Sequence, residues 1–166
     1  MKKKLIIING TMGVGKTATC KELNKKLENS VWLDGDWCWM INPFKVNDEN
    51  KKMVINNITY LLRSFLTNSS IKYIIFNWVI HVENIFSDVL EPLSDLDFEV
   101  VKISLTCSEE ALKKRILQDV KSNLREEACI SRSIERLKMY EDMTTEKIDT
   151  SNLSILETVD KIMKIV

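Results

Sequence analysis

Residues 4–17 read KLIIINGTMGVGKT, and this stretch decides the fold of the chain. Its first part, from Lys4 to Asn9, is a short apolar run rich in isoleucine, which is typical of a strand buried on both faces. Its second part matches the pattern G-x-x-x-x-G-K-[ST] at every fixed position from Gly10 to Thr17. A helical pattern follows from Lys16 to Asn29, so the order of strand, loop and helix that the motif requires is complete.

The loop has the composition of a phosphate-binding site. Its glycines allow successive backbone N–H groups to point inward at an anion, and the helix that follows adds the positive end of its dipole. In such a loop the lysine, here Lys16, contacts the β- and γ-phosphates, and the hydroxyl of Thr17 ligates Mg²⁺. We therefore predict ATP and Mg²⁺ as cofactors. The residues predicted to contact the nucleotide here are Gly10, Met12, Gly13, Val14, Gly15, Lys16, Thr17 and Ala18.

The composition of the 166 residues is that of one globular domain. Basic and acidic residues number 24 each, so the chain lacks the overall positive charge expected of a nucleic-acid binder. No segment approaches the roughly 20 apolar residues of a membrane-spanning helix. The four cysteines follow neither a zinc pattern nor a disulfide pattern. We therefore expect a cytoplasmic protein with no nucleic-acid or membrane partner, and the sequence does not predict its oligomeric state.

Strand patterns alternate with helix patterns along the rest of the chain. Further strands are expected at 31–33, 72–76, 99–105 and 147–148, and further helices at 48–66, 83–90, 106–120, 130–143 and 156–165. Such alternation favours βαβ units, in which each helix crosses over between two parallel strands. The sequence therefore predicts an α/β fold with a five-stranded parallel sheet flanked by helices.

Two carboxylates follow the second expected strand, in the segment Asp34-Gly35-Asp36-Trp37. Ligands of open α/β sheets bind at the carboxyl ends of the strands, so one carboxylate can approach the metal while the other holds the acceptor. The alternative is a polar turn. Trp37 and Trp78 both follow strand ends, where they are expected either to form a wall against the acceptor or to pack in the core.

Four of the five arginines lie between positions 115 and 136. Guanidinium groups bind phosphate oxygens through a planar fork of donors, and a mobile arginine can close over a triphosphate. We predict this role for Arg115 and Arg125, with a solvated helix face as the alternative. For Arg132 and Arg136 the solvated face is the plausible interpretation.

With these features in place, the chain resembles the P-loop kinases of the nucleoside and nucleotide kinase-like group. Shikimate kinase, gluconate kinase, adenylylsulfate kinase and chloramphenicol phosphotransferase belong to that group. The resemblance implies the three-layer α/β/α sandwich of P-loop NTPases, with the strand order 2-3-1-4-5. It also implies a single domain over residues 1–166 with a short lid at about 118–132, in which Arg125 is the lid arginine of the polar segment 121–129.

The resemblance also assigns individual residues to the site. It implies that Asp34 lies near Mg²⁺ and that Asp36 lies near the acceptor hydroxyl. Asn77 stands where many relatives carry an acidic partner of Mg²⁺, which places more of that role on Asp34. Arg115 falls where relatives place an arginine beside the adenine or the phosphates. The segment 148–152 resembles the loop that frames adenine, through Thr150 and Ser151.

We therefore expect ATP- and Mg²⁺-dependent transfer of the γ-phosphoryl group to a small-molecule acceptor, at a hydroxyl. The expected catalytic residues are Lys16, Asp36 and Arg125, the expected metal ligands are Thr17 and Asp34, and the expected acceptor contacts are Asp36, Trp37, Trp78 and Arg63. A nucleoside monophosphate kinase is one alternative, although Arg63 is the only arginine available to grip a second phosphate. An ATP-binding regulatory module without catalysis is an alternative from another class.

Overall fold

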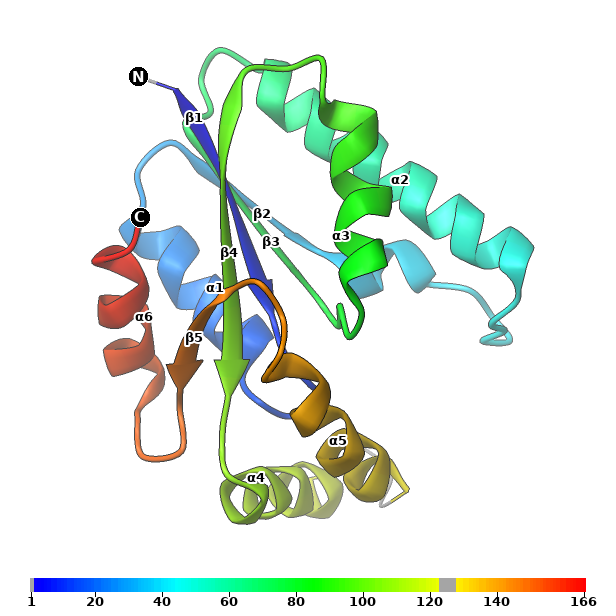
Figure 1. Ribbon diagram of the computed structural model, residues 1–166, viewed down its shortest axis with the longest axis vertical. Coiled ribbons are helices and arrows are strands. Elements are labelled where there is room, and N and C mark those ends of the chain that lie inside the picture. Colours follow the sequence, from blue (N-terminus) through cyan, green and yellow to red (C-terminus); the bar gives the residue numbers. More distant parts are fainter. Residues whose placement is uncertain (1, 123–127) are drawn as a thin grey trace.

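A computed structural model describes residues 2–122 and 128–166 (Figure 1). The chain alternates between strands and helices, as its sequence predicts. The elements are β1 (Lys3–Asn9), α1 (Lys16–Lys26), β2 (Ser30–Asp34), the 3₁₀ helix η1 (Gly35–Trp39), α2 (Asp48–Thr67), β3 (Tyr73–Trp78), α3 (Glu83–Leu90), the 3₁₀ helix η2 (Glu91–Leu93), β4 (Phe98–Thr106), α4 (Glu109–Lys121), α5 (Cys129–Leu137), the 3₁₀ helix η3 (Lys138–Tyr140), β5 (Glu146–Asp149) and α6 (Ile155–Met163).

The five strands form one parallel sheet in the order β2-β3-β1-β4-β5, which confirms the predicted fold class and strand order. β1 is the central strand and pairs with β3 on one side and β4 on the other. Because its residues from Leu5 to Ile8 are completely buried, the isoleucine-rich run is the spine of the core. The loop of residues 10–15 therefore leaves the sheet at its centre.

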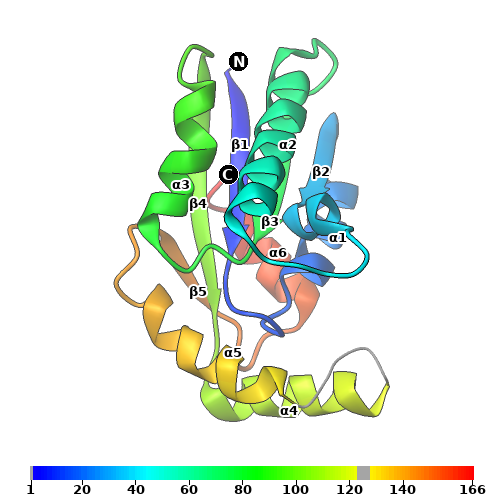
Figure 2. The same cartoon turned by 90° about the vertical axis from the view of Figure 1, so that its right-hand side faces the viewer.

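Helices cover both faces of the sheet, and the side chains of β1 alternate between the two resulting cores. Leu5 and Ile7 pack on the side of α2 and α3, whereas Ile6 and Ile8 pack on the side of α1 and α6. Figures 1 and 2 show these two layers, with α4 and α5 lying across the carboxyl ends of the strands. A functional site at those strand ends is thus enclosed by helices from both halves of the chain.

Some element boundaries differ from those expected. The helix predicted to run to Asn29 ends at Lys26, and Asn29 adopts a left-handed φ of 57° that turns the chain into β2. The helix predicted from 106 begins at Glu109, because β4 continues through Thr106 and Ser108 is the residue that caps α4. None of the helices described here has the length and the apolar composition needed to cross a membrane.

Candidate active site

The loop between β1 and α1 has backbone geometry that requires glycine. Gly10 and Gly13 have φ values of +146° and +85°, a region that residues with side chains rarely adopt. Each glycine also lies against a neighbour: a Cβ would stand 2.6 Å from the carbonyl oxygen of Leu105 at Gly10 and 2.7 Å from a side-chain carbon of Ile116 at Gly13. The loop is therefore packed tightly between α1 and the segment from β4 to α4.

Lys16 begins α1 and is buried at 9% exposure. Its Nζ donates hydrogen bonds to the carbonyl oxygens of Gly10 at 2.9 Å and Thr11 at 3.0 Å. The ammonium group is thus held against the start of the same loop whose glycine geometry suits an anion. This arrangement brings a positive charge to the place where the phosphates are predicted to bind.

The two aspartates after β2 have different surroundings. Asp34 is buried at 4% exposure and accepts a hydrogen bond from the hydroxyl of Thr17 at 3.0 Å. Its other carboxylate oxygen accepts from the backbone N–H of Asp36 at 3.1 Å, whereas the side chain of Asp36 belongs to an exposed residue. The carboxylate of Asp34 is therefore fixed beside the phosphate-binding loop, whereas Asp36 is exposed at the surface.

Thr17 and Asp34 fit the expected metal ligands, because hydroxyl and carboxylate oxygens are the ligands that Mg²⁺ prefers. In residues 2–122 and 128–166, no group of three or more His, Cys, Asp or Glu side chains is arranged to hold a metal ion. A magnesium ion here would therefore draw most of its ligands from phosphate oxygens and water, as Mg²⁺ at nucleotide sites does. Thr17 and Asp34 would supply the protein side.

Trp37 and Trp78, which the sequence predicts either as an acceptor wall or as core residues, pack on different neighbours. Trp78 packs against Gly35, where a Cβ would stand 2.6 Å from its ring, and against Phe76, with a distance of 6.5 Å between ring centroids. Trp37 is 52% exposed and packs on Trp32, with ring centroids 5.0 Å apart. Trp78 is therefore partly buried against the core on the side of α2 and α3, and Trp37 lies at the edge of the sheet.

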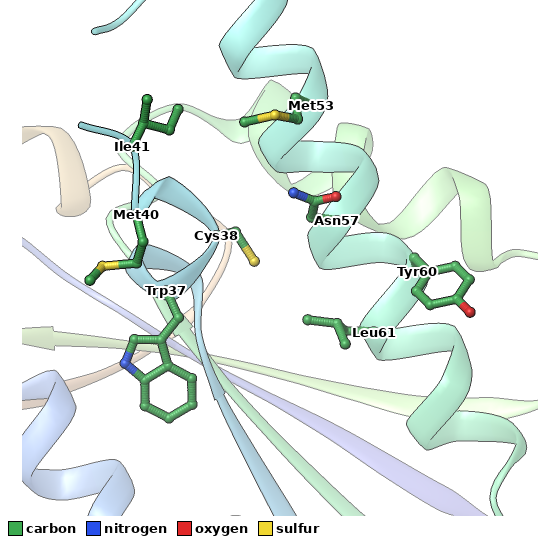
Figure 3. Close-up of a pocket in the computed structure, with 8 residues that line it drawn as sticks. All are labelled: Trp37, Cys38, Met40, Ile41, Met53, Asn57, Tyr60 and Leu61. Carbon is green, nitrogen blue, oxygen red and sulfur yellow. The ribbon is translucent and has the colours of Figure 1, made fainter. Parts of the chain in front are cut away.

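Trp37 lines an open pocket of about 530 Å³ between η1 and α2 (Figure 3). Met40 and Ile41 continue the wall formed by η1, and Met53 and Leu61 of α2 point toward it. None of the eight lining side chains carries a charge. This pocket lies on the α2 side of η1, whereas the Thr17–Asp34 pair lies on the α1 side of the sheet.

Arg63, the arginine predicted to contact the acceptor, lies elsewhere. Its guanidinium group forms a bidentate ion pair with Asp95, with distances of 2.8 Å and 2.6 Å, and donates a further hydrogen bond to the carbonyl oxygen of Pro92. These contacts fasten α2 to the end of η2. The structure does not bring Arg63 together with the phosphate-binding loop.

Arg115 reaches the loop from the middle of α4. Its guanidinium group donates to the carbonyl oxygen of Val14 at 3.3 Å and to the hydroxyl and carbonyl oxygens of Thr150 at 3.0 Å and 2.6 Å. Ser151 follows and accepts a hydrogen bond from the backbone N–H of Ser108 at 2.8 Å. Arg115 therefore joins the phosphate-binding loop to the segment predicted to frame adenine.

The predicted lid is described only in part, since Arg125 lies outside the described residues. The flanking helix α5 is described, and it meets the phosphate-binding loop directly. The hydroxyl of Thr11 donates to the backbone carbonyl oxygen of Ser133 at 2.9 Å. The segment that follows the predicted lid is thus anchored on the second residue of the loop motif.

The sequence interpretation did not bring together a polar group of side chains that lies beside this contact. Among the described residues, three buried polar atoms have no hydrogen-bond partner: His81 Nδ1, Ser133 Oγ and Tyr140 Oη. Burial and the positive charge of Arg136 lower the pKa of His81, although the nearby backbone of Val79 opposes this. The spacing 133, 136, 140 places Ser133, Arg136 and Tyr140 on one face of a helical segment, a signal that could have identified them.

Comparison with known proteins agrees with this fold. A family model described as AAA domain matches residues 6–148. Cytidylate kinase from Buchnera aphidicola subsp. Baizongia pistaciae (strain Bp) is 27% identical over 85 residues, which are 51% of this chain and 36% of that protein. The match therefore spans only about a third of the length of that relative.

Solved structures of kinases share the fold over almost the whole chain. A gluconokinase from Sinorhizobium meliloti 1021 superposes with a TM-score of 0.69 and 12% identity, covering 98% of this chain and 90% of that one. The APS kinase of Mycobacterium tuberculosis, solved in complex with AMPPNP and APS, superposes with a TM-score of 0.69 and 11% identity. The match covers 99% of this chain and 97% of that one. The predicted resemblance to P-loop kinases is confirmed.

Proposed function

Because this chain belongs to the AAA domain family, we propose that it is an ATP- and Mg²⁺-dependent phosphotransferase with a small-molecule acceptor. The γ-phosphoryl group of ATP would pass to a hydroxyl of that acceptor. One observation carries the proposal: the Thr17 hydroxyl and the buried Asp34 carboxylate are joined at 3.0 Å at the start of the helix that also carries Lys16. A lysine, a hydroxyl and a carboxylate in this position are the parts that phosphoryl transfer from a metal-bound nucleotide requires.

The residues of the loop would bind and orient the triphosphate. The backbone N–H groups of residues 10–15 and Lys16 would hold its β- and γ-phosphates, and Thr17 with Asp34 would hold the metal ion. Mg²⁺, when bound, neutralises charge on the phosphate oxygens. Since phosphoryl transfer depends mostly on positioning and charge, these contacts supply most of the catalysis.

Asp36 would hold the acceptor. Its backbone is fixed by the hydrogen bond to Asp34, and its side chain belongs to an exposed residue at the strand ends. From that position its carboxylate would accept the hydrogen bond of the attacking hydroxyl and orient it toward the γ-phosphate. Arg125, which lies outside the described residues, is proposed to contact the transferring phosphate from the lid.

A nucleoside monophosphate is the second candidate acceptor, favoured by the similarity to cytidylate kinase. A phosphorylated acceptor needs cations to balance its charge. Arg63 is already paired with Asp95. Arg136 lies close enough to His81 to lower the pKa of the imidazole, and it follows Ser133, which contacts Thr11 of the loop. Turnover of a nucleoside monophosphate faster than of its nucleoside would establish this candidate.

The proposal is tested by measuring ADP formation with nucleosides, nucleoside monophosphates, sugar acids and aminoglycosides as acceptors. The same assays are run on Lys16→Ala and on a matched control, Lys21→Ala, which removes an exposed lysine of the same helix. A charge-assisted hydrogen bond to phosphate contributes about 1.5–3 kcal/mol, so Lys16→Ala should bind ATP at least about tenfold more weakly by calorimetry.

Lys21→Ala should retain the affinity of the wild type. Unchanged ATP affinity in a folded Lys16→Ala protein would contradict the proposed nucleotide site. ATP binding without transfer to any acceptor would instead support the regulatory module.

A further inference from the structure

Asn77 lies at the end of β3, the strand next to β2, which carries the proposed metal ligand Asp34. It is in parallel register with Asp34 on β2 and with Ile8 on β1, and it is 1% exposed. A carboxylate at this position would add a second acidic group beside Asp34. An amide presents an acceptor at one end and two donors at the other, so its role depends on which end faces the nucleotide.

Trp32 decides that orientation. Its indole Nε1 lies 2.6 Å from Oδ1 of Asn77. An indole N–H can only donate, so the atom that it meets must be the amide oxygen, and the two ends of the amide are thereby distinguished. The acceptor end of Asn77 is engaged by Trp32, and the Nδ2 donor end is turned away from the indole.

The donor end remains available. No protein group among residues 2–122 and 128–166 accepts a hydrogen bond from Nδ2 of Asn77, and this atom is not one of the fully buried polar atoms without a partner. This atom is therefore slightly exposed, although Asn77 as a whole is 1% exposed. Asp34 is the register neighbour of Asn77 on β2, and Asp34 in turn contacts Thr17.

Trp32 is itself supported on its outer side. The ring of Trp37 packs on it, with centroids 5.0 Å apart and an angle of 56° between the ring planes. Trp32 is partly buried against the core shared by α1 and α6. The indole is thus placed by contacts on both sides, and it can hold the amide in one orientation.

We propose that Asn77 donates a hydrogen bond from Nδ2 to a phosphate oxygen of the bound nucleoside triphosphate. Trp32 is the positioning residue that turns the amide to do so. This inference rests on the proposed function, because it requires a nucleotide in the loop of residues 10–17. It leaves Thr17 and Asp34 as the protein ligands of the metal and gives the end of β3 a phosphate-binding role.

Binding of the ATP analogue AMPPNP with Mg²⁺, measured by calorimetry without acceptor, tests the role of Asn77. In Asn77→Asp a carboxylate oxygen replaces the donor and faces the phosphates, so affinity should fall at least about tenfold, as for other charged contacts to phosphate. The affinity of Asn77→Ala, which introduces no charge, should fall less. If Asn77 instead accepts a hydrogen bond from a water molecule bound to Mg²⁺, Asn77→Asp should bind AMPPNP as tightly as the wild type or more tightly. It should then also reach half-maximal binding at a lower Mg²⁺ concentration.

A double-mutant cycle tests the role of Trp32. Trp32→Phe keeps an aromatic ring and removes the N–H. When Asn77 is present it should weaken AMPPNP binding several-fold, and when it is combined with Asn77→Ala it should cause no further loss. Trp39→Phe is the matched control, because the ring of Trp39 packs against Phe44. An equal loss from Trp32→Phe in both backgrounds would show that Trp32 acts only by packing.

The outcomes separate this inference from the proposed function. A wild-type protein that binds no AMPPNP overturns the proposed function, and the role of Asn77 with it. Wild-type binding that is unchanged in Asn77→Asp overturns only the role of Asn77. Circular dichroism and thermal unfolding of each variant confirm that the comparison is made between folded proteins.

Discussion

The hydroxyl of Thr17 donates a hydrogen bond to Oδ2 of Asp34 at 3.0 Å, which joins the first turn of α1 to the end of β2. The same carboxylate accepts from the backbone of Asp36 through its other oxygen. A single buried side chain therefore connects the phosphate-binding loop with the residue proposed to hold the acceptor. This connection predicts different consequences for substitution of the two aspartates.

Asp34→Asn should raise the Mg²⁺ concentration needed for half-maximal rate. The amide keeps the shape of the carboxylate but loses the negative charge that attracts the metal. A Mg²⁺ titration of the rate measures the effect, with Asp97→Asn, an exposed aspartate paired with Lys2, as the control. Equal Mg²⁺ dependence in Asp34→Asn and the wild type would contradict the metal role.

Asp36→Asn should leave the affinity for ATP and Mg²⁺ nearly unchanged and strongly lower kcat. The exposed amide can still receive a hydrogen bond, but it cannot take a proton from the acceptor hydroxyl. Steady-state kinetics over a range of acceptor and Mg²⁺ concentrations separate the two effects. If Asp36→Asn changes the metal dependence while Asp34→Asn does not, the roles of the two residues are reversed.

Arg115→Lys should lower both thermal stability and affinity for ATP. Lysine keeps the positive charge but lacks the planar fork that contacts Val14 and both oxygens of Thr150. Each lost hydrogen bond to a charged group contributes about 1.5–3 kcal/mol. Lys114→Ala changes the neighbouring exposed residue and should have little effect. Wild-type ATP affinity and melting temperature in Arg115→Lys would refute the connecting role of Arg115.

Gly35→Ala should destabilise the fold, because the new Cβ would stand 2.6 Å from the ring of Trp78. Overpacking of this kind costs about 1–3 kcal/mol of unfolding free energy. Denaturant titration measures the loss, and the double variant Gly35→Ala with Trp78→Leu should lose less than the sum of its two single variants. Strict additivity would show that the close contact does not constrain η1.

Stability should fall as the pH is lowered through the ordinary pKa of histidine, about 6.5. Burial lowers the pKa of His81 in the fold, so the unfolded chain takes up the proton at a higher pH and is favoured by acid. Because the chain has one histidine, His81→Asn should flatten this part of the curve of unfolding free energy against pH.

The charge of Arg136 contributes to the same effect. Arg136→Met should raise the pKa of His81, measured by NMR titration of the imidazole, whereas Arg132→Met, at an exposed position of α5, should not. An unshifted titration in Arg136→Met would place the guanidinium group away from His81.

Local rules were sufficient for the framework of this protein. The run from Lys4 to Asn9 becomes a buried strand because its four consecutive apolar residues form a continuous core segment. The loop motif follows because its glycines permit backbone angles that other residues rarely adopt. The alternation of strands and helices predicted the parallel sheet.

The sequence determined these features because each depends on backbone conformation or on hydrophobic periodicity within a few residues. Tertiary structure alone decided which polar side chains meet. Arg63 pairs with Asp95, Trp37 packs on Trp32 at the sheet edge, and the indole of Trp32 selects the orientation of Asn77. Each of these side chains had several chemically suitable partners along the chain. The choice among them depends on the distances set when the helices pack on the sheet, which no local pattern encodes.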